Sequence, residues 1–185
     1  MSIHQKIKEE ILSKIVKPLN RTIGLEIECI IHTSDNKRLP VNKNKDFNAT
    51  NFLNIANDQS KNNGSYTLEP GGQLEWASKP YKNLHALEKA IRKHNDFLLT
   101  IAKRHRLKFL YYGVDPFFNP SDVDLINLSK YQLMDENMKR SGSMGSWMMK
   151  CTSSIQVNFD VISAEEMEEM VFVADCLHPI ASYLF

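Results

Sequence analysis

Residues 66–78, YTLEPGGQLEWAS, contain two apolar-rich runs separated by a Pro-Gly-Gly segment, a pattern typical of a β-hairpin. A three-residue loop at 70–72 sets three pairs opposite each other: Glu69 and Gln73, Leu68 and Leu74, and Thr67 and Glu75. One face then carries Glu69, Gln73 and Glu75, and the other carries Leu68, Leu74 and Trp76. A two-residue turn would place Leu68 beside Glu75 on a mixed face, which a half-buried sheet resists. We therefore expect the three-residue loop, with the two glutamates forming either part of a site or a solvated outer face.

A second acidic pair lies in residues 22–32, TIGLEIECIIH, a run rich in β-branched residues that predicts a central strand. Glu26 and Glu28 are two residues apart, so in a strand they point to the same side, with Cα atoms about 6.6 Å apart. Two carboxylates on one face of an apolar strand are costly if they are buried unpaired, and a basic partner or a cation relieves that cost. A solvent-facing surface is the alternative. The second pair, in the hairpin, favours a cation.

A third informative stretch, residues 152–161, alternates strictly between polar and apolar side chains. Its polar positions are Thr152, Ser154, Gln156, Asn158 and Asp160, and its other positions are Ser153, Ile155, Val157, Phe159 and Val161. The alternation predicts a strand with one face in the core and one polar face, as antiparallel sheets allow. Short amides and hydroxyls favour a ligand-binding floor for the polar face, with a solvated sheet face as the alternative.

Helical periodicity predicts amphipathic helices at residues 3–16, where the apolar stripe should contact the core, and at 83–106, with Asn83 as the N-cap. Residues 129–139 also have a helical pattern, and Ser163 with Glu166 forms a capping box that opens a final helix with an inward apolar stripe. Residues 33–64 predict a polar loop with one or two helical turns. Residues 108–114 predict a short strand, and residues 141–145 a flexible connection of small residues.

Composition indicates a single domain, because 185 residues with 42% hydrophobic content can form a substantial core. The 23 basic and 22 acidic residues give a net charge of +1, so charge gives no reason to expect a nucleic-acid or anionic-membrane partner. Residues 1–20 lack the apolar core of a signal peptide, and no stretch approaches the roughly 20 apolar residues of a membrane span. We expect a cytoplasmic protein.

Five motifs in the correct order resemble glutamate–cysteine ligases of the plant and proteobacterial type. They are GLEIE at 24–28, LEPGGQLE at 68–75, KYQLM at 130–134, GSMG at 142–145 and SIQVNFD at 154–160. The resemblance runs from about residue 20 to residue 185. It implies that residues 1–185 are the N-terminal part of a single catalytic domain, and the apolar end HPIASYLF at 178–185 predicts a chain truncated at its C-terminus.

The resemblance implies an α+β fold like the catalytic domain of glutamine synthetase, with a curved antiparallel sheet and helices on one face. It also implies an ATP- and Mg²⁺-dependent reaction in which the side-chain carboxylate of glutamate is phosphorylated and the amine of cysteine attacks it. The product would be γ-glutamylcysteine, in the first step of glutathione biosynthesis. The implied partners are therefore small molecules: glutamate, cysteine and ATP.

The resemblance also implies roles for individual residues. The metal ligands would be Glu26, Glu28, Glu69, Glu75 and Gln156. The substrate-binding residues would be Gln73, Gly145, Met148, Lys150, Thr152 and Asn158. The chain departs from the family pattern at Cys151, where a basic residue is usual and where Lys150 stands one place earlier.

Three alternatives remain open from the sequence. A sister carboxylate–amine ligase that uses another amine would present the same metal-binding face. A non-catalytic truncated fragment could bind Mg²⁺ without turnover. A metal-dependent hydrolase would need an acid/base histidine or aspartate near the carboxylates, and residues 24–28 and 68–75, which carry the glutamates, contain no histidine.

Overall fold

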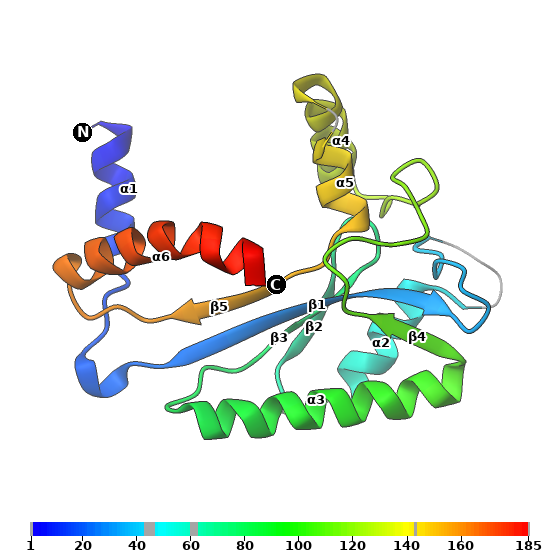
Figure 1. Ribbon diagram of the computed structural model, residues 1–185, viewed down its shortest axis with the longest axis horizontal. Helices are drawn as coiled ribbons and strands as arrows, with labels where there is room; N and C mark the ends of the chain where they lie inside the picture. The colour runs from blue at the N-terminus through cyan, green and yellow to red at the C-terminus, as the bar shows by residue number, and fades with distance from the viewer. Residues whose placement is uncertain (1, 43–46, 60–62, 143, 185) are drawn as a thin grey trace.

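The computed structural model describes residues 2–42, 47–59, 63–142 and 144–184 of the chain. Two parts of the predicted polar loop, 43–46 and 60–62, lie outside these ranges, as does Ser143 of the predicted small-residue connection. Helices and an open antiparallel sheet are combined in one arrangement, which confirms the α+β class, while the likeness to glutamine synthetase stays a prediction (Figure 1). The expectation of helices on one face is wrong, because helices lie on both sides of the sheet.

Strand β1 (Ile23–Thr33) is the long central element of the sheet. Its antiparallel neighbours are β3 (Leu74–Ala77), β4 (Leu107–Leu110) and β5 (Ile155–Phe159), and β2 (Ser65–Leu68) pairs with β3. β5 pairs with the first half of β1 and β4 with the second half. One strand therefore pairs with segments from three distant parts of the sequence.

The β2–β3 hairpin has the predicted register. Leu68 pairs with Leu74 and Thr67 pairs with Glu75, while the Glu69 N–H donates to the Gln73 carbonyl at 2.9 Å. The three-residue loop is therefore confirmed. Gly72 supplies the positive φ of +80° that closes it.

The core lies on one face of this sheet, under helices α2 (Ala49–Gln59) and α3 (Leu84–His105). β1 contributes alternate residues from Leu25 to Ile31, and the hairpin contributes Tyr66, Leu74 and Trp76. In Figure 1, α3 runs below β1, and helices α4, α5 and α6 lie on the upper side of the sheet. Because β-strand side chains alternate, burying this apolar set leaves the glutamates of β1 and β3 on the opposite face.

Three apolar surfaces that the sequence assigned to the core are exposed. Helix α1 (Ile3–Leu12) has no buried residue, and Ile3 is 71% exposed. Helix α6 (Ala164–Leu184) opens with the predicted Ser163–Glu166 cap but also buries no residue. On β5, Ile155 is 66% exposed. For β5 the physical reason is that the covering helices α2 and α3 pack mainly on β1, β2 and β4.

Two predicted irregular segments contain more helix than expected. The predicted connection at 141–145 is interrupted by α5 (Met144–Cys151), which packs against α4 (Ser129–Ser141). The loop at 33–64 contains the whole of α2, and a 3₁₀ turn (Pro18–Asn20) precedes β1. Within the described ranges, no helix has both the length and the apolar character needed to cross a bilayer.

Candidate metal centre

Three glutamates from three strand segments meet on the polar face of the sheet. The β1–β3 register places Glu28 directly opposite Glu75, and Glu69 follows β2 at the entry to the Pro-Gly-Gly turn. One carboxylate oxygen from each of the three residues lies within 4.8 Å of the others. The predicted hairpin face and the predicted strand face therefore form a single acidic cluster.

Hydrogen bonds orient two of these carboxylates. The Ser154 N–H donates to Glu28 Oε2 at 3.0 Å, and Gln156 Nε2 donates to Glu28 Oε1 at 3.2 Å. Thr67 Oγ1 donates to Glu75 Oε1 at 2.8 Å. Within the part of the chain that the structure describes, none of the ion pairs includes any of the three carboxylates. Among the described residues the cluster therefore concentrates negative charge without a direct ion pair, although the charge of Lys130 acts on Glu69.

Partial burial and mutual repulsion raise the pKa values of two of these groups. For Glu69, burial raises the pKa most, and the neighbouring charges of Glu75 and Glu28 raise it further. For Glu28, burial raises the pKa and repulsion from Glu75 adds to it, while the hydrogen bonds from Ser154 and Gln156 lower it. A bound cation would relieve both effects because it favours the ionised carboxylates.

A pocket of about 280 Å³ adjoins the cluster, and several predicted site residues line it. Its lining includes Glu28, Glu69, Gln73, Met134, Met148, Thr152 and Gln156. Gln73 is almost fully buried, and its Nε2 donates to the Thr152 carbonyl at 2.9 Å. Its Oε1 is buried and has no hydrogen-bond partner among the described residues. A buried amide oxygen without a donor is a hard ligand that a cation or a substrate N–H could satisfy.

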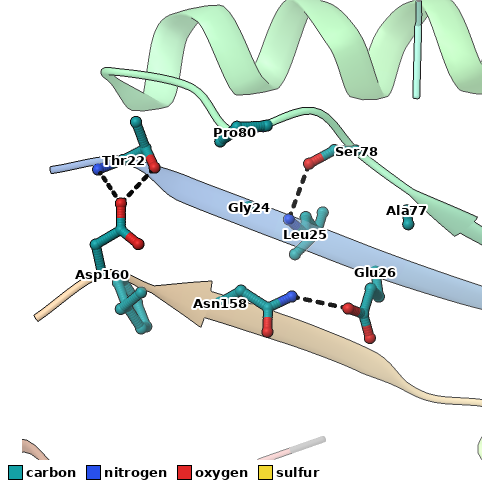
Figure 2. A pocket seen from close by; sticks show the side chains of 10 residues that line it. Thr22, Gly24, Leu25, Glu26, Ala77, Ser78, Pro80, Asn158 and Asp160 are labelled. Carbon is teal, nitrogen blue, oxygen red and sulfur yellow. Dashed lines mark hydrogen bonds between the residues drawn. The ribbon is translucent and has the colours of Figure 1, made fainter. Parts of the chain in front are cut away.

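Glu26 and Asn158 lie beside this cluster and line a separate hollow of about 220 Å³. Asn158 Nδ2 donates to Glu26 Oε1 at 3.0 Å, as Figure 2 shows. In the same view, Asp160 accepts hydrogen bonds from Thr22 N and Oγ1. Glu26 is not one of the three clustered carboxylates, so its role as a metal ligand stays a prediction.

Besides Asn158, the predicted substrate residues Gly145 and Lys150 do not line the pocket. A Cβ atom on Gly145 would lie 2.5 Å from Met138 Cβ, so this glycine allows α5 to pack closely on α4. Lys150 Nζ donates to the Pro120 carbonyl at 3.1 Å. The structure gives both residues packing or hydrogen-bonding roles, and their contact with substrate stays a prediction.

Other residues near the cluster were not among the predicted site residues. Met134 and Met149 line the pocket, but methionines on an amphipathic helix are usually read as core residues. Arg38 lies in the predicted polar loop, where a basic residue is unremarkable. Only the chain path shows that these side chains approach the acidic strands.

The donor set fits a magnesium ion. Mg²⁺ prefers hard oxygen ligands and is commonly bound through a small number of carboxylates together with substrate phosphates. The three clustered carboxylates provide such donors. Glu28, Glu69 and Glu75 are the residues that would hold the ion.

Comparison with known proteins agrees with the motifs. Residues 22–184 match the model of glutamate-cysteine ligase family 2 (GCS2). The chain is 32% identical over 121 residues to a chloroplastic glutamate–cysteine ligase of Medicago truncatula, covering 65% of this chain and 24% of that protein. Chloroplastic glutamate–cysteine ligase A of Oryza sativa subsp. indica is 31% identical, with coverages of 65% and 25%. The chain therefore spans about a quarter of the length of the curated relatives it matches.

The expectation of a cytoplasmic protein is contradicted, because these relatives and one from Arabidopsis thaliana are all named chloroplastic. That expectation used the charge pattern of residues 1–20, which bears on secretory export and does not separate the cytoplasm from a plastid. The family assignment does not depend on the compartment. From its motifs and the match over residues 22–184, the chain belongs to glutamate-cysteine ligase family 2.

Proposed function

We propose that this protein contributes the metal-binding part of an ATP- and Mg²⁺-dependent ligase that joins the side-chain carboxylate of glutamate to the amine of cysteine. The product is γ-glutamylcysteine, the first intermediate of glutathione biosynthesis. The observation that carries the proposal is the convergence of Glu28, Glu69 and Glu75, each with a carboxylate oxygen within 4.8 Å of the others. Family membership supports the same chemistry.

We further propose that residues 1–185 form part of a single catalytic domain of the glutamine-synthetase type. In such a domain the polar face of an antiparallel sheet is the catalytic surface. The arrangement here supports that assignment because apolar side chains of β1 and β3 pack on α2 and α3, whereas their glutamates occupy the other face. The buried face would keep the strands rigid, and rigid strands place ligands more reproducibly than loops.

In this proposal the three carboxylates bind the cation, and their neighbours hold them in place. When bound, Mg²⁺ would neutralise the phosphate oxygens of ATP during transfer to glutamate. The Ser154 N–H and Gln156 orient Glu28, and Thr67 orients Glu75. Fixed ligands of this kind avoid the free-energy cost of reorganising the site during the reaction.

The neighbouring pocket supplies a place for an amino-acid substrate. Gln73 and Thr152 give it a polar floor, and Met134 and Met148 give it an apolar wall. Glutamate's side chain bound there would carry its carboxylate toward the cation. The carboxylate oxygen would attack the γ-phosphorus of ATP and release ADP. The cysteine amine would then attack the acyl carbon and release phosphate.

Glu75→Gln tests the metal assignment in the protein carrying the complete activity. We expect turnover to fall about 100-fold or more, because a charged ligand is replaced by a weaker neutral one. For the same reason, the Mg²⁺ concentration needed for half-maximal activity should rise at least about tenfold. Circular dichroism should show an unchanged fold. Glu88→Gln, on the exposed surface of α3, removes the same charge elsewhere and should leave both values unchanged. Wild-type kinetics in Glu75→Gln would refute the assignment.

The amine substrate requires a separate assay. ADP release should be measured with glutamate and cysteine and then with a panel of other amines in place of cysteine. Strong preference for cysteine supports the proposed activity, and preference for another amine would identify a sister carboxylate–amine ligase with the same metal-binding face.

A second candidate function is cation binding without turnover. It is favoured by the presence of the three-carboxylate cluster in a chain that spans about a quarter of its relatives' length. Calorimetric Mg²⁺ binding by residues 1–185, without ADP release in the same preparation, would support this candidate.

A further inference from the structure

A second charged cluster is buried next to the acidic site. Arg38 Nη1 donates to Asp115 Oδ2 at 2.6 Å, and His32 Nε2 lies 3.0 Å from the same oxygen. The side chains of Asp115 and His32 are fully buried, and that of Arg38 is 6% exposed. The other Asp115 oxygen accepts from the Phe117 N–H at 3.0 Å and the Phe118 N–H at 3.3 Å. Asp115 is therefore held firmly, and it anchors the guanidinium.

The second arm of the Arg38 guanidinium joins two segments of the acidic site. Nη2 donates to the Gly71 carbonyl at 3.1 Å and to the Lys150 carbonyl at 2.8 Å. Gly71 is in the turn between Glu69 and Gln73, and Lys150 is in the last turn of α5, close to Thr152. One side chain thus joins the residues next to Pro70 and Met149, two residues that line the pocket beside the carboxylates.

The fit between the turn and α5 is tight. A Cβ atom on Gly71 would lie 2.6 Å from both the Cα and the carbonyl oxygen of Lys150. Gln73, two residues further on, donates to the carbonyls of Met149 at 3.3 Å and Thr152 at 2.9 Å. The turn that carries Glu69 is therefore held against α5 from two directions.

We propose that Arg38 is a positioning residue of the metal centre, which fixes the Pro-Gly-Gly turn against α5 and thereby holds Glu69 beside Glu28 and Glu75. The inference rests on the proposed function for its metal. It adds a residue outside the carboxylate-bearing strands, and that residue touches neither the cation nor the substrate.

The chemistry of arginine suits this task. Its planar guanidinium presents several N–H donors in a fixed fork, so one group can bind a carboxylate and two carbonyls simultaneously. A lysine ammonium in the same place could keep the charge pair with Asp115 but would lack this fixed geometry. A buried charged cluster contributes little net stability compared with apolar packing, so its main consequence here is a defined arrangement.

Arg38→Lys tests the proposal, with Mn²⁺ as the probe. We expect the Kd for Mn²⁺, followed by electron paramagnetic resonance, to rise about tenfold in a variant whose circular dichroism is unchanged. Amide exchange at residues 69–73 should accelerate, because the turn loses an anchor to α5. Arg92→Lys, at an exposed α3 position paired with Glu88, is the matched control and should change neither measurement.

Gly71→Ala provides an independent second variant. It leaves the buried charges intact but introduces a methyl group against Lys150, so it should reproduce both effects even where Arg38→Lys fails to fold. Unchanged Mn²⁺ affinity and unchanged exchange in folded Arg38→Lys, or in Gly71→Ala where Arg38→Lys does not fold, would overturn the proposal.

The exchange measurement separates this inference from the proposed function. If the wild-type chain binds no Mn²⁺, the metal assignment fails, and faster exchange at 69–73 in the variants then still supports Arg38 as the anchor of the turn. If the wild type binds Mn²⁺ but the variants keep both its affinity and its exchange pattern, the metal assignment stands and the positioning role is refuted.

Discussion

Glu69→Gln should stabilise the metal-free protein at neutral pH. In the acidic cluster, oxygens of Glu69, Glu28 and Glu75 lie within 4.8 Å of one another. Two unit charges at that distance repel by about 0.9 kcal/mol in water and by about 3.5 kcal/mol at an effective dielectric constant near 20. Because these carboxylates are only partly buried, solvent screening favours the lower part of that range. We expect a net gain of about 1–2 kcal/mol, or a rise of roughly 2–8 °C in Tm.

The pH dependence follows from the raised pKa of Glu69. A carboxyl group with a folded-state pKa above its ordinary value of 4.5 favours the folded state when it is protonated. Its contribution is fully present below the unfolded-state pKa and is lost as pH rises through the folded-state pKa. The advantage of Glu69→Gln should therefore be greatest at neutral pH, shrink as pH falls toward about 4, and decrease with added salt.

With Mg²⁺ bound, the wild type should be more stable than Glu69→Gln. A ligand that binds only the folded state stabilises it in proportion to RT ln(1 + [L]/Kd), so the wild type should gain more from Mg²⁺ than Glu69→Gln. Urea unfolding at pH 7, with and without Mg²⁺, measures both effects, and Glu88→Gln serves as the charge-matched control. The reasoning is refuted if Glu69→Gln is no more stable than the wild type without metal and gains as much from Mg²⁺.

Two further predictions concern the core that supports the site. Burial lowers the pKa of His94 to about 4 from 6.5, so protonation favours the unfolded state and stability should decline as pH falls from about 6.5 to about 4. Urea unfolding across that range should show a shallower decline in His94→Gln, and an equal decline would contradict the argument. Asn83→Ala removes the side-chain cap that accepts from the Ala86 N–H at 2.9 Å, and should cost about 1 kcal/mol in chemical denaturation. A free energy of unfolding equal to that of the wild type would show that the cap contributes nothing.

The sequence predicted the carboxylate-bearing strands well because local chemistry determines them. The Pro-Gly-Gly loop and the apolar alternation around it specify one register, and the structure has that register. The same alternation in β5 identified two faces but could not reveal that α3 stops short of Ile155 and Val157. Helix α5 was missed because Gly145 and its small neighbours suggest a flexible connection, whereas the glycine permits close packing on Met138.

Local spacing predicted which glutamates share a face, but long-range pairing decides which of them meet. Spacing placed Glu26 and Glu28 on one side of a strand, but only the pairing with β3 selects Glu28 as the partner of Glu75. Glu26 instead accepts a hydrogen bond from Asn158, one strand away. Arg38 and Asp115 are separated by 77 residues, and no local pattern predicts that they meet beside the turn.

The central claim, that three strand segments direct their carboxylates to one divalent cation, is tested most directly by a crystal structure obtained with Mn²⁺. Manganese gives an anomalous signal and accepts the oxygen ligands that suit Mg²⁺. We predict an anomalous peak bonded to carboxylate oxygens of Glu28, Glu69 and Glu75. A crystal whose manganese lies elsewhere, with these three glutamates left uncoordinated at saturating Mn²⁺, would contradict the claim.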